Sequence, residues 1–166
     1  SHAGRKASTQ RPWEGRGALG PQEDPWQTLA PSAIAYDPDP AWHTPRALSV
    51  TEIRAIVDAF AASAERARRI GLDCIELHAS HGYLMHQFFS PLSNQRTDDY
   101  GGSLGNRLRA PLETARALRE ALPRERILGA RISADDWVEG GASLDDTIAY
   151  ARGLQSIGFD YVCVSS

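Results

Sequence analysis

Apolar positions recur with helical spacing in three stretches of the chain. The first stretch follows Ser49 and Glu52, whose Ser-x-x-Glu spacing matches a capping box at a helix start. Its apolar face comprises Ile53, Ile56, Val57, Phe60, Ala64 and Ala67. We therefore expect a helix that begins after Ser49 and ends near Gly71, a residue suited to a helix end.

Short apolar runs alternate with these helical stretches. The predicted strands span residues 73–77, 127–133 and 161–165. A second helix is expected from about residue 104 to 122, interrupted or kinked near Pro111, because proline breaks the helical hydrogen-bond ladder. A third helix begins at 143–146 and ends at Gly158. This alternation favours a parallel sheet in an α/β fold, and near-continuous apolar strands favour a sheet covered on both faces.

Residues 1–50 show little periodicity and are rich in glycine, proline and tryptophan. We expect a long loop region, and such loops in compact domains are often functional. Arg5 and Lys6 lie near its start. They could be surface charges, or they could contact an anion or a cofactor.

Both ends of the chain look like cuts in a longer sequence. The chain starts at Ser1, its single methionine is Met85, and it stops directly after the apolar run 161–164. Three predicted strands cannot close a (β/α)8 barrel. Such a barrel has roughly 250 residues and would need about five more strands. We therefore expect a piece of a longer protein.

Composition narrows the class of protein. The 166 residues are 42% hydrophobic and 23% charged, with a net charge of -3, so nothing suggests a nucleic-acid or anionic membrane partner. No apolar run approaches the ~20 residues of a membrane span, and no signal-peptide pattern is present. A cytoplasmic protein is expected. Cys74 and Cys163 lie in apolar runs and are interpreted as buried free thiols. A disulfide between them is the alternative, although nothing in the sequence suggests an oxidising compartment.

Polar side chains gather where the predicted strands end. These are His78, His81 and Tyr83 after the first strand, Arg131 and Ser133 at the second, and Ser165 at the third. Both a (β/α)8 barrel and an open α/β sheet place their ligand sites at the carboxyl ends of the strands. We therefore expect the site at this end.

His78 and His81 have three interpretations. They could be ordinary hydrogen-bonded structural histidines. They could share a metal, with Glu76, Asp98 or His86 as a third ligand. They could also be two N–H donors that hold a carbonyl or nitro oxygen. Tyr83 follows with a phenol of pKa near ~10, either packed in the fold or able to donate a proton.

Two further features carry alternatives. Arg131 lies inside an apolar strand, where it could pair with Glu76 or contact an electron-rich cofactor ring. Glycines at 101 and 102 precede Ser103 and a predicted helix. A tight turn explains them most simply, and a phosphate cradle at the helix N-terminus is the alternative.

The stretch 76–107 resembles the central signature of the old yellow enzymes, which are FMN-dependent ene-reductases. Its matching parts are Glu76-Leu77-His78, His81-Gly82-Tyr83, Ser90-Pro91-Leu92-Ser93-Asn94, Arg96-Thr97-Asp98, Tyr100-Gly101-Gly102-Ser103 and Asn106-Arg107. Residues 2–7 resemble the segment after the family's third strand, and 11–15 its bacterial xenobiotic-reductase branch. Residues 131–133 and 164–166 resemble the ends of its fifth and sixth strands.

The resemblance implies a fold, namely a (β/α)8 TIM barrel of which this chain supplies roughly strands 4 to 6 and their helices. Residues 1–166 would form one partial FMN oxidoreductase domain. Within it, 1–50 would be the long loop region after strand 3, and 51–166 the βα units.

The resemblance also implies roles. His78, Ala79, Ser80 and His81 would bind substrate, with the two histidines on its carbonyl oxygen, and Tyr83 would protonate its α-carbon. Arg131 would contact FMN, with NAD(P)H as hydride donor. The substrate would be a small activated alkene, an α,β-unsaturated carbonyl or nitro compound. A homo-oligomer stays open.

The family's first strand and its phosphate-binding loops after strands seven and eight have no counterpart here. Two alternatives to the ene-reductase therefore remain. One is a truncated, non-catalytic fragment that cannot hold FMN. The other is a metal-dependent TIM-barrel hydrolase that uses His78 and His81.

Overall fold

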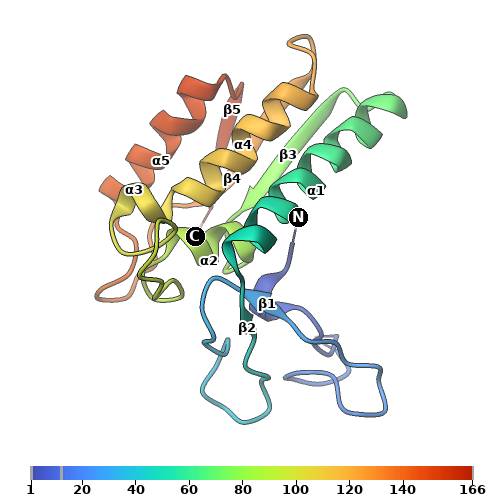
Figure 1. Cartoon of the computed structure of the whole chain (residues 1–166), viewed down its shortest axis with the longest axis vertical. Helices are drawn as coiled ribbons and strands as arrows, with labels where there is room; N and C mark the ends of the chain where they lie inside the picture. Colours follow the sequence, from blue (N-terminus) through green and yellow to red (C-terminus); the bar gives the residue numbers. More distant parts are fainter. Residues whose placement is uncertain (1, 12, 166) are drawn as a thin grey trace.

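Three parallel strands organise the molecule, in the order β3-β4-β5 (Figure 1). The computed structural model describes residues 2–11 and 13–165; Pro12 and Ser166, which belong to two of the resembling segments, lie outside these ranges, as does Ser1. The elements are η1 (Gly4–Lys6), β1 (Leu29–Ala30), β2 (Arg46–Ala47), α1 (Val50–Arg69), β3 (Cys74–Ala79), α2 (Leu84–Phe89), α3 (Leu104–Arg107), α4 (Arg109–Ala121), β4 (Ile127–Ser133), α5 (Leu144–Ile157) and β5 (Tyr161–Ser165). The predicted parallel α/β alternation is confirmed.

The register of the sheet sets which side chains are neighbours. Glu76 of β3 lies opposite Gly129 of β4, and His78 lies opposite Arg131. Arg131 in turn lies opposite Cys163 of β5. Paired residues of parallel strands share a face, so these side chains form rows across one side of the sheet.

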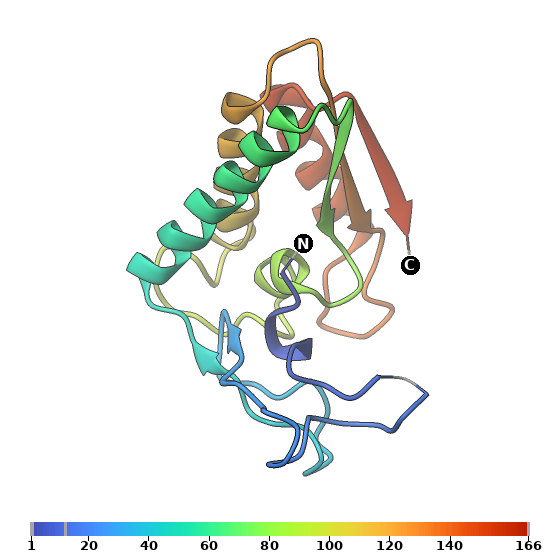
Figure 2. The same cartoon turned by 90° about the vertical axis from the view of Figure 1, so that its right-hand side faces the viewer.

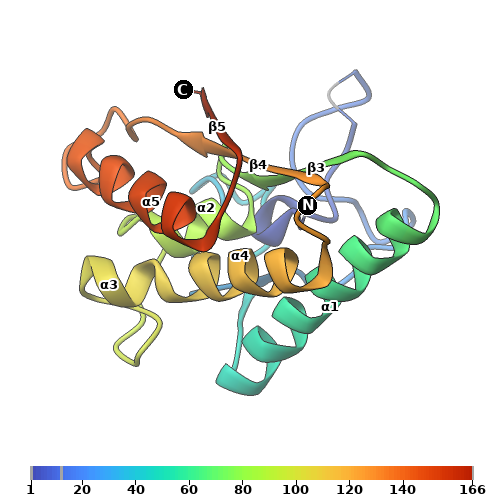
Figure 3. The same cartoon turned by 90° about the horizontal axis from the view of Figure 1, so that it is seen from above.

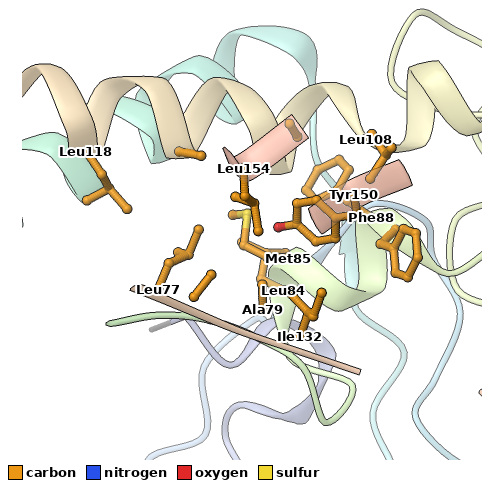
Figure 4. Packing of buried hydrophobic residues seen from close by; sticks show 14 of the residues in the cluster. Leu77, Ala79, Leu84, Met85, Phe88, Leu108, Leu118, Ile132, Tyr150 and Leu154 are labelled. Atoms are coloured by element: carbon orange, nitrogen blue, oxygen red, sulfur yellow. The ribbon is translucent and has the colours of Figure 1, made fainter. Parts of the chain in front are cut away.

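Helices α1, α4 and α5 all pack against the other side of the sheet (Figures 2 and 3). The strand residues on that side are almost fully buried: Leu77, Ala79, Leu128, Ala130 and Ile132 are each 2% exposed or less. Figure 4 shows this core, in which Leu118, Tyr150 and Leu154 from the helices meet α2 and the strands. Burial of apolar surface on this side holds the helices to the sheet.

The helix ends follow local signals. Ser49 and Glu52 form the predicted capping box at the start of α1, in which each side chain bonds the other residue's backbone N–H. Ser143 and Asp146 form a second capping box at α5. Gly158 ends α5 in the left-handed conformation, with φ of +95°, which glycine adopts without strain.

The break near Pro111 falls three residues earlier than expected. The helical stretch divides at Leu108 into α3 and α4, and Pro111 is the third residue of α4. The first N–H groups of a helix have no intrahelical acceptor, so a proline there removes no bond. The interruption is therefore a helix start, with proline inside the first turn. The structure differs from the prediction in two other places. Strand β3 runs to Ala79, beyond its predicted end at residue 77, and helix α2 was not predicted.

The opposite face of the sheet is open in the described residues. Cys74 and Tyr161 are exposed there, and both cysteines are free. The prediction of two buried cysteines was wrong: Cys74 is exposed and Cys163 is half-buried. A strand alternates its side chains, and both cysteines fall on the side of the sheet that the helices do not cover. The expectation that both faces are covered is likewise not met by these residues.

The N-terminal region contains more structure than the predicted loop. It includes η1, a two-residue parallel pairing of β1 with β2, and an isolated bridge between Thr9 and Ala18. In Figure 2 this region lies beyond the tip of the β3 arrow, on the same side as α2. It is therefore placed at the end of the sheet where the candidate residues gather. No helix among the described residues has both the length and the hydropathy needed to cross a membrane.

Candidate active site

The three predicted rings meet at the carboxyl end of β3. His78 ends the open-face row of β3, His81 lies in the following turn, and Tyr83 precedes α2. The His78 ring centroid lies 5.1 Å from that of His81 and 5.0 Å from that of Tyr83, both edge to face. The turn has left-handed backbone at two residues, with φ of +58° at His81 and +70° at Gly82. A non-glycine residue in this conformation is uncommon and is seen where surrounding contacts hold it.

His78 is set up as a neutral N–H donor. Burial, then the charges of His81 and Arg131, lower its pKa below the usual range. The Ser80 backbone N–H points at its Nδ1 at 3.4 Å, and the Ser80 hydroxyl lies 3.1 Å away. Because an amide N–H can only donate, Nδ1 accepts and the proton is assigned to Nε2. That Nε2–H can donate to a ligand oxygen.

His81 is held by both neighbouring strands. Its backbone N–H donates to the Ser133 hydroxyl of β4 at 3.3 Å. Its Nε2 lies 2.7 Å from the Ser165 hydroxyl of β5. The carboxyl ends of β3, β4 and β5 therefore meet at His81, as the sequence predicted for this end of the sheet.

A buried network behind the turn was not predicted. The Gly82 N–H donates to His86 Nδ1 at 2.8 Å, so His86 carries its proton on Nε2 and donates it to Asp136 Oδ1 at 2.9 Å. Asp136 Oδ2 accepts from the Ser90 hydroxyl at 2.6 Å and from the Ala142 N–H at 2.8 Å. This chain of bonds ties the loop after β4 to the turn that carries His81 and Tyr83.

Asp136 is ionised throughout the neutral range. Its burial works against the charge, but hydrogen bonds from His86, Ser90 and the Ala142 N–H outweigh burial and lower its pKa to about 2. Sequence reasoning considered His86 only as a metal ligand. A signal for Asp136 was present, since it follows the strand 127–133 by three positions.

Arg131 and Glu76 form the predicted pair on the open face. Arg131 Nε lies 3.0 Å from Glu76 Oε1, and the Tyr161 hydroxyl donates to Glu76 Oε2 at 3.2 Å. The bond to Glu76, then the neighbouring Cys163, raise the pKa of Arg131. Because a guanidinium has five N–H donors and this pair uses one, the others can reach a second electron-rich partner.

Ala79 and Ser80 differ in what they contact. Both are fully buried. Ala79 belongs to the core on the helix side of the sheet, as Figure 4 shows, and Ser80 contacts the His78 ring. Their role in binding substrate stays a prediction.

The alternatives for two motifs can be compared with the geometry. Within residues 2–11 and 13–165, no group of three His, Cys, Asp or Glu side chains could hold a metal ion.

At Gly101, a Cβ would lie 2.3 Å from the Arg96 carbonyl oxygen, and Gly102 has φ of +77°. The tight-turn interpretation accounts for both glycines.

Lys6 reaches the site from the N-terminal region. Its ammonium donates to the His81 carbonyl at 3.0 Å and lies 5.0 Å from the Tyr83 ring centroid. Arg5 instead donates to the Ala35 carbonyl at 3.0 Å. Of the two cations at the start of the chain, Lys6 is the one beside the candidate residues.

Comparison with known proteins gives a consistent picture. The profile of the NADH:flavin oxidoreductase / NADH oxidase family matches residues 2–165. An NADH:flavin oxidoreductase of Gibberella zeae is 43% identical over 179 residues, covering 100% of this chain and 43% of the relative. An NADPH dehydrogenase of Bacillus velezensis is 41% identical over 166 residues, covering 100% of this chain and 44% of the relative.

Solved structures agree with the sequence comparison. Morphinone reductase in complex with tetrahydroNAD has a TM-score of 0.78 and 31% identity, covering 98% of this chain and 46% of that one. An old yellow enzyme homologue from Zymomonas mobilis has a TM-score of 0.72 and 27% identity, covering 84% of this chain and 42% of that one. The chain thus spans less than half the length of these relatives.

Proposed function

This chain belongs to the NADH:flavin oxidoreductase / NADH oxidase family, and we propose that the complete protein uses NAD(P)H to reduce activated C=C bonds. The resemblance to the old yellow enzymes is confirmed, and the α/β sheet is part of their (β/α)8 barrel. The proposed substrates are α,β-unsaturated carbonyl or nitro compounds. One observation carries this proposal: a neutral His78, His81 and a tyrosine converge at the carboxyl end of β3.

Each ring has a separate task in this proposal. His78 donates its Nε2–H to the substrate's carbonyl or nitro oxygen, and His81 binds beside it. These contacts strengthen as negative charge develops on that oxygen. Tyr83 supplies the proton that the α-carbon needs, because a neutral phenol is a suitable acid for a carbon that becomes enolate-like.

The residues on the open face fit FMN. Arg131 projects there with N–H donors beyond the one bound to Glu76, and it keeps its charge because that pair raises its pKa. A fixed cation of this kind suits the electron-rich edge of a flavin ring. FMN, when bound, would take hydride from NAD(P)H and deliver it to the β-carbon of the alkene.

The test uses the complete protein that contains this chain. We expect it to purify with a flavin absorption band and to oxidise NAD(P)H when an enone is added. Protein that binds no flavin and reduces no enone would contradict the proposal and favour the non-catalytic fragment. Activity that follows added zinc instead of flavin would favour the metal-dependent hydrolase.

A further inference from the structure

A pocket lies directly beside Tyr83, on the side of the N-terminal loops. Its volume is about 580 Å³, and its lining includes Lys6, Gln10, Arg16, Tyr36, Trp42 and Tyr83. Tyr83 is therefore shared between this pocket and the candidate active site. None of the roles assigned above uses the rest of the lining.

The lining brings together cations and aromatic rings. Lys6 Nζ lies 4.7 Å from the Tyr36 ring centroid and 5.0 Å from that of Tyr83. The Tyr36 and Trp42 rings are 4.7 Å apart and tilted by 59°. The pocket lining, all of it within the described residues, holds two cations and no carboxylate. An anion attached to a flat apolar group suits such a surface.

The cations keep free donors. Lys6 uses one of its three N–H groups on the His81 carbonyl. Arg16 pairs with Asp37 at 3.4 Å, but its side chain is 78% exposed, so that pair is weak. Either cation can therefore bind an incoming anion without breaking a strong internal contact.

The loops that form the pocket are tied to one another by backbone bonds. The Gln10 N–H donates to the Gly17 carbonyl at 3.0 Å, and the Ala18 N–H donates to the Ala41 carbonyl at 2.7 Å. Gly17 has φ of +111°, and a Cβ there would lie 2.7 Å from the Ala41 carbonyl oxygen. The wall is preorganised, which lowers the entropy cost of binding.

We propose that this pocket binds the carboxylate end of an acidic substrate, so that the protein prefers enones that carry an aryl carboxylate. The enone oxygen contacts His78 and His81, the aryl ring extends past Tyr83 toward Tyr36 and Trp42, and the carboxylate reaches Lys6 and Arg16. This substrate class rests on the proposed function, because it shares Tyr83 with that site.

The test compares two probes of nearly equal shape: benzylideneacetone with a para carboxylate, and the same compound with a para carboxamide. In the complete wild-type protein, kcat/KM for the acid should exceed that for the amide by about tenfold, as for one charge-assisted hydrogen bond. Lys6→Met should remove most of this ratio, and Arg16→Gln part of it. Because the carboxamide probe is uncharged, a change in its kcat/KM in Lys6→Met measures any indirect effect of the substitution on His81.

Arg11→Gln is the matched control, since Arg11 is an exposed loop arginine that pairs with Glu14 and does not line the pocket. It should keep the wild-type ratio. Calorimetric titration of the oxidised protein with both probes, without NAD(P)H, gives a second readout that needs no turnover. Tighter binding of the acid with no reduction of either probe would reject the ene-reductase function and retain the pocket.

Three outcomes would overturn the proposal that this pocket binds a carboxylate. The first is equal turnover and equal binding of the two probes by the wild-type protein. The second is a preference for the acid that survives both Lys6→Met and Arg16→Gln, or that Arg11→Gln removes equally well. The third is a Lys6→Met variant that is weakened only toward NAD(P)H, which would assign the lysine to the hydride donor.

Discussion

The two faces of the β3-β4-β5 sheet are built from the same strands and have opposite characters. On the helix side, Leu128 and Ile132 are fully buried, and the side chains of that row are apolar. On the open side, Arg131 and the Tyr161 hydroxyl both donate to the Glu76 carboxylate. A strand places alternate residues on opposite faces, so one stretch of sequence supplies both an apolar packing surface and a polar one.

This comparison separates stability from chemistry. Substitutions that shorten side chains on the helix side remove buried apolar contacts and should lower the free energy of unfolding. Substitutions on the open side, or at the carboxyl end of the sheet, should change turnover and ligand binding. The experiments below test these two kinds of effect in turn, from the largest expected change to the smallest.

Tyr83→Phe should give the largest effect, confined to turnover. In the complete protein, reoxidation by an enone should slow by about 10²–10⁴-fold, the usual contribution of a positioned general acid. The rate at which NAD(P)H bleaches the flavin band should stay near wild type, since that step needs no phenol. Stopped-flow absorbance measures both rates separately.

The two rates together decide the role of Tyr83. If flavin reduction and reoxidation slow equally, Tyr83 shapes the active site and does not donate the proton. If neither slows, the proton comes from elsewhere. An unchanged melting temperature serves as the control for the fold.

Ile132→Ala should act on stability. Ile132 is fully buried against the helices, so removal of its side chain should lower the free energy of unfolding by about 2–5 kcal/mol. Ile70→Ala is the matched control, because Ile70 is 76% exposed at the end of α1. Denaturant titration measures both variants. Equal losses would mean that the helix-side row does not carry the stability assigned to it.

His78→Ala should weaken binding of phenols, whose oxygen resembles that of an enolate. Loss of one donor to such an oxygen should cost on the order of 3 kcal/mol, and turnover should fall with it. Optical titration of the complete protein with a phenol measures the first effect. Unchanged affinity together with unchanged turnover would contradict the carbonyl-binding role.

Asp136 links the carboxyl end of the sheet to pH. A folded pKa of about 2, below the ~3.9 of a free aspartate, means that its stabilisation is complete above pH ~4 and is lost as pH falls toward 2. We expect a loss on the order of 2 kcal/mol across this window, measured by denaturant titration at several pH values. Asp136→Asn should lack this part of the acid dependence. The same acid profile in both proteins would place the responsible carboxylate elsewhere.

The sequence itself determined the features that depend on near neighbours. Ser49 and Glu52 are three residues apart, and they form the predicted capping box. The alternation of helices and strands follows from apolar spacing, and the ranges 127–133 and 161–165 match β4 and β5. His78, His81 and Tyr83 also lie within one strand end and turn, so their proximity could be read from the chain. Their catalytic roles remain predictions.

The tertiary structure decided the contacts between distant segments. His86 and Asp136 are 50 positions apart, and Lys6 reaches a carbonyl 75 positions away. No local signal specifies such pairs, because they arise only when the strands align in register and the loops pack at their ends. Exposure was decided in the same way: Cys74 and Leu77 belong to one apolar run, and which side the helices cover separates them. Periodicity predicts that a strand has two faces, and only packing selects the one that is buried.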